Sequence, residues 1–94
     1  MKSFNDYVYE YFLQETSGVR GSHVEDLMKA YLLQEITSPK GLVVEDLWFE
    51  WFVEKGFSSG SMDERWYAFL VSEGYSGTLR EMLYGYFKDK VEGE

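Results

Sequence analysis

One helical pattern recurs five times along the 94 residues, and it constrains the fold more than any other feature. In each copy apolar residues occupy positions i, i+3, i+4, i+7 and i+8, with Arg65 as the only exception. The five sets are Phe4, Tyr7, Val8, Tyr11 and Phe12; Val24, Leu27, Met28, Tyr31 and Leu32; Val44, Leu47, Trp48, Trp51 and Phe52; Met62, Arg65, Trp66, Phe69 and Leu70; and Leu79, Met82, Leu83, Tyr86 and Phe87. This spacing forms one face of an α-helix. The sequence therefore predicts five short amphipathic helices from a degenerate repeat of 17–20 residues.

Signals for helix starts and stops agree with the periodicity. Four copies begin with Ser or Thr followed three residues later by Asp or Glu, which is the pattern of a capping box. The pairs are Ser3 and Asp6, Ser22 and Glu25, Ser61 and Glu64, and Thr78 and Glu81. The third copy has Leu42 at this position instead. Gly56 and Gly74 each follow a last apolar turn and precede an aromatic residue, which predicts Schellman stops.

The predicted fold class is all-α, with helices over about residues 4–15, 23–36 and 43–55 and two more after residues 61 and 78. The length predicts a single helical repeat domain over residues 1–94. We expect Glu92–Glu94 to be frayed. The period alone fits either a compact bundle or a short helical array.

Composition narrows the possible functions. The net charge is −8 and the nine basic residues are scattered, which argues against binding to a nucleic-acid backbone and favours a partner with a basic patch. The absence of cysteine excludes disulfides and thiolate zinc sites. The apolar runs are too short to span a membrane, and the first residues lead into a polar-faced helix, so we expect a protein that is neither membrane-embedded nor secreted.

No set of residues predicts catalysis, a cofactor or a metal site. Acidic pairs recur in first helical turns, where the helix dipole favours them, and adjacent helical residues do not face each other. These pairs are Glu25 and Asp26, Glu45 and Asp46, and Asp63 and Glu64. His23, the only histidine, has no evident metal-binding or catalytic partners. Arg65 either passes its stem along the core or pairs with an acidic residue or a partner. We therefore predict that the protein is not an enzyme.

Apolar residues also occur opposite the main stripe. The aromatic residues on this second face are Tyr9, Phe49, Tyr67 and Tyr84. A helix that is apolar all round is usually buried, so these rings either complete the core or form an exposed surface for a partner or a second copy. The chain carries 3 Trp, 8 Tyr and 7 Phe, more rings than five short helices readily bury, so we predict that some of the four bind protein. If they are core, the loops at Gly18–Gly21 and Pro39–Gly41 become the working surface.

The segments Gly56–Leu70 and Gly74–Phe87 resemble small structural proteins of tailed bacteriophages. The pattern of these proteins is Gly-x-x-Gly-Ser/Thr-Leu-x-Asp, ending in an aromatic-rich helix, and the two segments are variants of it. All five copies are variants of this pattern, although Glu81 stands where Asp is usual and the third copy lacks Ser or Thr. The resemblance implies a virion or assembly component, located in the virion or the host cytoplasm, that contacts a capsid, portal or tail protein or associates with itself.

The leading hypothesis is therefore a non-enzymatic protein–protein interaction module, a structural or assembly component of a phage particle. The alternative is an acidic DNA mimic, or another inhibitor of a host protein, for which the net charge of −8 is the motive. A DNA mimic needs carboxylates arranged in rows like phosphates.

Overall fold

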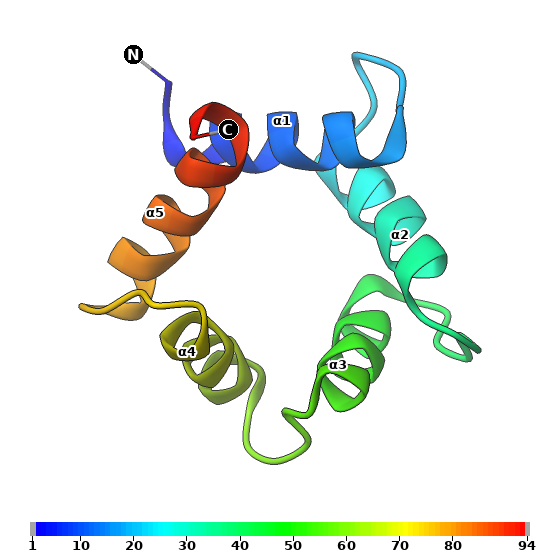
Figure 1. Ribbon diagram of the computed structural model, residues 1–94. Coiled ribbons are helices and arrows are strands. Elements are labelled where there is room, and N and C mark those ends of the chain that lie inside the picture. The colour runs from blue at the N-terminus through cyan, green and yellow to red at the C-terminus, as the bar shows by residue number, and fades with distance from the viewer. Residues whose placement is uncertain (1, 94) are drawn as a thin grey trace. The chain divides into compact units, whose positions relative to one another are not determined.

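The computed structural model describes residues 2–93, and in this range the chain forms five α-helices and no strand (Figure 1). The all-α prediction is confirmed. The helices are α1 (Phe4–Thr16), α2 (Val24–Glu35), α3 (Val44–Lys55), α4 (Met62–Ser72) and α5 (Leu79–Glu92). None of the helices described is long and apolar enough to cross a membrane.

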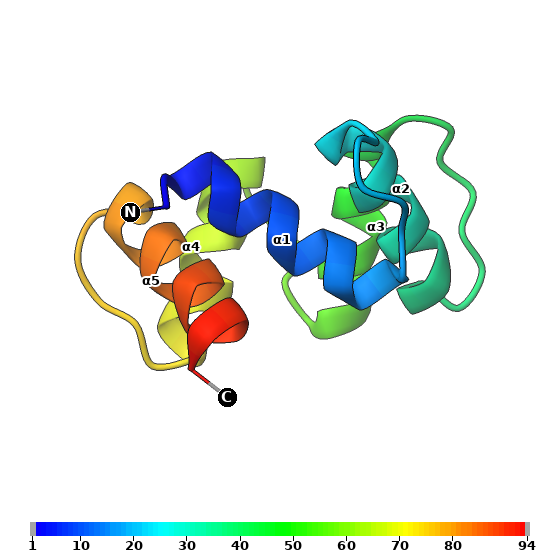
Figure 2. The same cartoon turned by 90° about the horizontal axis from the view of Figure 1, so that it is seen from above.

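The helices group into two compact units, each described here by itself. The described part of unit 1 comprises residues 2–11 and 59–93, with the first turns of α1 and the whole of α4 and α5. Unit 2 comprises residues 12–58, with the end of α1 and the whole of α2 and α3. Within each unit the two complete helices lie side by side (Figure 2). The single-domain assignment of residues 1–94 stays a prediction.

The cores of both units are built from the predicted stripe. Among the residues described, every buried apolar side chain except Ile36 belongs to the repeated pattern. The i+7 and i+8 positions are buried in all five helices, whereas the first position of the stripe is half-buried or exposed. The buried part of the stripe is therefore centred on its last two positions.

Aromatic contacts fill the core of unit 2. Phe52 on α3 is 0% exposed, and its ring centroid lies 5.1 Å from that of Trp51 and 6.1 Å from that of Trp48. From α1, Phe12 makes edge-on contacts with Tyr31 at 5.3 Å and with Trp48 at 6.0 Å. Such ring pairs add about 0.5–1.5 kcal/mol beyond the area they bury. The aromatic surplus of this unit is thus largely used in packing.

Phe87 on α5 has the corresponding role in unit 1. Its centroid lies 6.3 Å from that of Phe4, 5.4 Å from that of Tyr11 and 6.4 Å from that of Trp66. It also contacts Tyr86 edge-on at 5.2 Å. One side chain of α5 therefore joins the start of α1 to α4.

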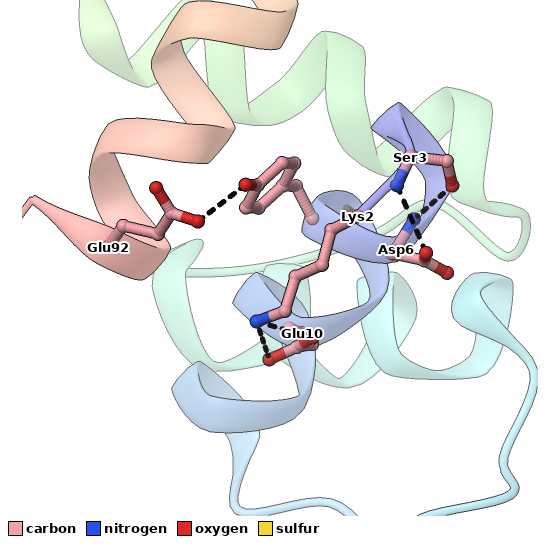
Figure 3. Close-up of polar contacts among 6 residues, drawn as sticks. Lys2, Ser3, Asp6, Glu10 and Glu92 are labelled. Carbon is pink, nitrogen blue, oxygen red and sulfur yellow. Dashed lines mark hydrogen bonds and ion pairs between the residues drawn. The ribbon is translucent and has the colours of Figure 1, made fainter.

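Two tyrosine hydroxyls connect α5 to the rest of unit 1. Tyr7 on α1 donates to the carboxylate of Glu92 (Figure 3), and Tyr75 in the loop before α5 donates to Asp89 at 2.7 Å. The bond to Glu92 is the main cause that raises the pKa of Tyr7 to about 12. Burial, followed by the bond to Asp89, raises the pKa of Tyr75 to about 12. Both contacts need the neutral phenol, so they hold α5 while these tyrosines are protonated.

The end of α5 is held by two contacts. The helix continues to Glu92, and the Gly93 N–H donates to the carbonyl of Asp89 at 2.7 Å. The carboxylate of Glu92 is held by Tyr7, a contact that the repeat pattern does not reveal. The fraying expected from Glu92 onward stays a prediction. Glu94 lies outside the described residues.

Three of the four predicted capping boxes are present. In each, the hydroxyl accepts from an N–H of the first turn and the acidic side chain accepts from the N–H of the capping residue. The pairs are Ser3 and Asp6 (Figure 3), Ser61 and Glu64, and Thr78 and Glu81. The bonds from Thr78 lower the pKa of Glu81, which shows that the box favours the ionised carboxylate.

The box predicted at Ser22 is wrong, because α2 begins one residue later. Its N-cap is His23, which makes no side-chain capping bond, and the Leu27 N–H donates to the His23 carbonyl. Ser22 instead closes a turn by donating its N–H to the carbonyl of Val19 at 3.2 Å, with Gly21 at a φ of 101°. The turn therefore leaves the Ser22 hydroxyl one position outside the helix.

Both predicted Schellman stops are confirmed. At the end of α3, the Phe57 N–H donates to the Phe52 carbonyl at 2.8 Å, and Gly56 takes the left-handed conformation with a φ of 99°. At the end of α4, the Tyr75 N–H donates to the carbonyl of Leu70 at 3.0 Å. These bonds satisfy carbonyls that a helix end otherwise leaves without a partner.

Three of the serine and threonine starts allow a direct comparison of capping. Replacing Ser61 or Thr78 by Ala should lower the free energy of unfolding by about 1 kcal/mol, because each removes an N-cap acceptor. Ser22→Ala should change it by no more than about 0.5 kcal/mol, since Ser22 caps nothing. Urea denaturation followed by circular dichroism measures all three. A loss at Ser22 equal to that at Ser61 would contradict the observed start of α2.

Candidate functional site

Of the four aromatic residues predicted to bind protein, Tyr67 on α4 is the one with an exposed side chain, at 50%. The other three, Tyr9, Phe49 and Tyr84, are half-buried. The Tyr84 ring stacks on Phe4 at 6.5 Å between centroids and meets Tyr7 edge-on at 5.6 Å. Three of the four residues belong to unit 1, whereas Phe49 belongs to unit 2, so neither unit contains the whole set. Their binding role stays a prediction.

Tyr67 does have an exposed apolar neighbour on its own helix. Val71 follows it by four residues on α4 and is 48% exposed. Residues four apart share one face of a helix, so the two side chains form a small apolar face. This part of the second face, which contains Tyr67, is therefore at the surface.

The loop between α2 and α3 in unit 2 is fixed by two carboxylates of α3. Glu54 accepts from the Thr37 N–H at 3.0 Å, and Glu50 accepts from the N–H groups of Lys40 and Gly41 at 2.9 and 2.6 Å. Hydrogen bonds to ionised acceptors are about twice as strong as neutral ones. Both ends of the loop are therefore attached to the helix that follows it. One of the two loops considered from sequence, Pro39–Gly41, lies here.

Gly41 is required for the close contact between this loop and α3. A Cβ atom at Gly41 would lie 2.8 Å from the Asp46 Cβ, 2.8 Å from the Glu50 Oε2 and 3.2 Å from the Leu47 backbone N. A side chain at this position would push the loop away from the first turn of α3. The glycine thus lets the backbone lie directly on the carboxylate that holds it.

Two apolar side chains project from the end of this fixed loop. Leu42 is 82% exposed and Val43 is 56% exposed. Val43 is the N-cap of α3, with no side-chain capping bond, and its carbonyl accepts the first helical bond from Leu47. Val43 therefore stands where α1, α4 and α5 have a residue with a capping hydroxyl. Leu42 and Val43 remain at the surface, although the backbone of the loop is fixed.

These side chains border an open groove in unit 2 with a volume of about 190 Å³. Its lining residues are Glu25, Asp26 and Lys29 of α2, and Leu42, Val43 and Val44 at the start of α3. We call this feature the Leu42 groove. It combines an apolar side with two carboxylates and one ammonium group.

The volume indicates what kind of ligand fits. Sites for small-molecule substrates and cofactors occupy about 300–1,000 Å³. The Leu42 groove, at about 190 Å³, is smaller than this range.

Of the other chemical candidates from the sequence, His23 and the acidic pairs are exposed, and Arg65 is half-buried. The acidic pairs lie in first turns of α2, α3 and α4, as the helix dipole favours. Arg65 donates from Nε to the carbonyl of Gly60 at 2.9 Å. No group of three or more His, Asp or Glu residues within residues 2–93 is placed to hold a metal ion.

Sequence reasoning did not select Leu42 and Val43 as binding residues. The available signal was the missing Ser or Thr at the start of α3. The sequence pattern predicts Leu42 at the N-cap position, but this is wrong by one residue, because Val43 is the N-cap and Leu42 precedes it. An apolar residue that neither caps nor continues the stripe points to an exposed contact.

No family model, curated protein or solved structure matches this chain.

Proposed function

We propose that the protein is a non-enzymatic protein-binding module that holds its partner at the Leu42 groove. The observation that carries this proposal is the pair Leu42 and Val43, exposed on a loop whose backbone is fixed by Glu50 and Glu54. Exposed apolar side chains are typical of interaction sites. A fixed backbone lowers the entropy lost on binding, so a small contact area gains affinity.

Within this proposal, the partner is a component of a phage particle, and the protein has a structural or assembly role. The support is the repeated Gly-Ser/Thr helix pattern, which resembles that of small phage structural proteins. Capsid, portal and tail proteins are the partner classes that follow. Incorporation of a tagged chain into particles assembled in its presence, detected after density-gradient separation, tests this role.

The alternative, an acidic DNA mimic, is less well supported by the carboxylates. Many of them accept hydrogen bonds within the fold rather than standing free in rows. Carboxylates that do so include Asp6, Glu10, Glu50, Glu54, Glu64, Glu81, Asp89 and Glu92. Their positions serve caps, loops and tyrosine contacts, which favours protein binding over mimicry.

Leu42→Ser should separate binding from stability. Because the side chain is 82% exposed, the free energy of unfolding should change by no more than about 0.5 kcal/mol. Loss of an apolar contact at the centre of an interface should weaken association by about 2 kcal/mol, or roughly thirtyfold. Chemical denaturation and incorporation into particles provide the two measurements.

Leu33→Ser is the matched control, since Leu33 is an exposed leucine of the same unit, on α2, at 45% exposure. Both variants lose the same side chain, but only Leu42 lines the groove. Equal loss of incorporation in the two variants would show that the Leu42 groove is not the specific binding site. Unchanged incorporation in both would contradict the proposed function.

A further inference from the structure

We propose that the occupant of the Leu42 groove is a segment of another protein that places one aliphatic side chain against Leu42 and Val43 and a Lys or Arg side chain beside Glu25 and Asp26. This inference rests on the proposed function and adds the chemistry of the partner. Three features of the groove support it.

The first feature is the availability of its carboxylates. Within the described part of the chain, the side-chain carboxylates of Glu25 and Asp26 take part in no hydrogen bond or ion pair, unlike those of Glu50 and Glu54 in the same unit. Both are exposed and both line the groove. A cationic side chain placed here can therefore pair with carboxylates that make no other hydrogen bond or ion pair among the described residues.

The second feature is the sign of the surrounding charge. Lys29 is the one basic residue among the lining residues, so Glu25 and Asp26 leave the lining net negative. Glu45 and Asp46 follow directly in the first turn of α3, and the whole chain carries −8. An acidic segment would be repelled, and a wholly apolar segment would leave the carboxylates without a counter-charge.

The third feature is the combination of small volume and apolar edge. A groove of about 190 Å³ fits one side chain, and the exposed edge is formed by leucine and valine. An aliphatic side chain the size of leucine or valine fills such a space, and both it and the side chains of the groove then become buried. The two requirements together describe a short segment in which a basic residue neighbours Leu, Ile or Met.

The same charges argue against a second copy of this chain as the occupant. Each copy carries −8, and its nine basic residues are scattered, so two copies repel each other at low salt. A partner of opposite local charge gains the attraction that a second copy lacks. We therefore assign the groove to a different protein.

The test uses the full chain and three short fluorescent peptides of equal length. One alternates lysine and leucine, one replaces its lysines by glutamate, and one replaces its leucines by serine. Fluorescence anisotropy at low salt should show the tightest binding for the lysine–leucine peptide. Raising the salt concentration should weaken that binding, because exposed charges are screened.

Substitutions then locate the binding. Glu25→Lys should weaken binding of the lysine–leucine peptide by about tenfold or more, because attraction becomes repulsion. Asp63→Lys is the matched control: it replaces an exposed carboxylate at the second residue of α4, as Glu25 is the second of α2, but lies in unit 1. Circular dichroism confirms that each variant keeps its helices. Leu42→Ser should weaken the same binding to a similar degree.

The possible outcomes distinguish this inference from the function on which it rests. In one outcome, the glutamate–leucine peptide binds as tightly as the lysine–leucine peptide or more tightly, and that binding is lost in Leu42→Ser. This result overturns the proposal that the partner is basic, but it leaves the proposal of protein binding at the groove intact. A Leu42-dependent dimer seen by light scattering overturns the assignment to a different protein. Equal effects of Glu25→Lys and Asp63→Lys show a general charge effect and overturn the inference. Absence of binding by all three peptides overturns it as well.

Discussion

Phe52→Ala is expected to lower the free energy of unfolding of unit 2 by about 3–5 kcal/mol. Phe52 is 0% exposed and contacts the rings of Trp48 and Trp51, so its removal leaves a cavity and breaks several ring contacts. Domains have only about 5–15 kcal/mol of stability in total. The variant should therefore be partly unfolded near room temperature or melt far below the parent protein.

Val53→Ala provides the control, because Val53 is the next residue of α3 and is 53% exposed. It should change the free energy of unfolding by no more than about 0.5 kcal/mol. Denaturation followed by tryptophan fluorescence reports on unit 2 through Trp48 and Trp51 once Trp66 of unit 1 is replaced by Phe. Similar losses for both substitutions would show that the buried face of α3 has been misassigned.

Raising the pH from about 9 to about 12 is expected to unfold unit 1 before unit 2. The bond to Glu92 raises the pKa of Tyr7 to about 12, and burial with the bond to Asp89 raises that of Tyr75 to about 12. Burial also raises the pKa of Tyr86. In the unfolded chain a tyrosine loses its proton near pH 10. The stability that the neutral tyrosines contribute is therefore fully present below about pH 10. It is lost as the pH rises through their pKa values in the folded protein.

All three tyrosines belong to unit 1, which makes the prediction specific. Absorbance of tyrosinate follows the ionisation, while tryptophan fluorescence of single-unit reporter variants follows each unit. The Tyr7→Phe/Tyr75→Phe double variant should lose less stability over the same pH interval than the parent, because two of the titrating contacts are gone. Simultaneous loss of both units at a pH below 10 would contradict this account.

The repeated stripe predicted the helices because burial of one helical face dominates the stability of short helices. Gly56 and Gly74 were predictable as stops because only a few residues adopt the left-handed conformation easily. The start of α2 could not be predicted, because it depends on a turn from Val19 to Ser22 that competes with capping by Ser22. A pattern of four residues cannot show which of two local hydrogen-bonding arrangements prevails.

The binding surface was less predictable than the fold. Half-burial of Tyr84 depends on its packing against Phe4 and Tyr7, which are about eighty residues away along the chain. Exposure of Leu42 depends on Glu50 holding the loop in place. Both are tertiary contacts, for which a single sequence gives no direct signal. The missing Ser or Thr at the start of α3 was the only local indication.

The assignment of α1 to both units has a consequence for cooperativity. Its Tyr7, Val8 and Tyr11 side chains belong to the core of unit 1, whereas Phe12 belongs to the core of unit 2. Melting this one helix therefore removes core side chains from both units at once. Helix formation is itself cooperative along the backbone, so a local opening at one end of α1 makes the other end easier to open. The covalent continuity of α1 thus links the two folding equilibria.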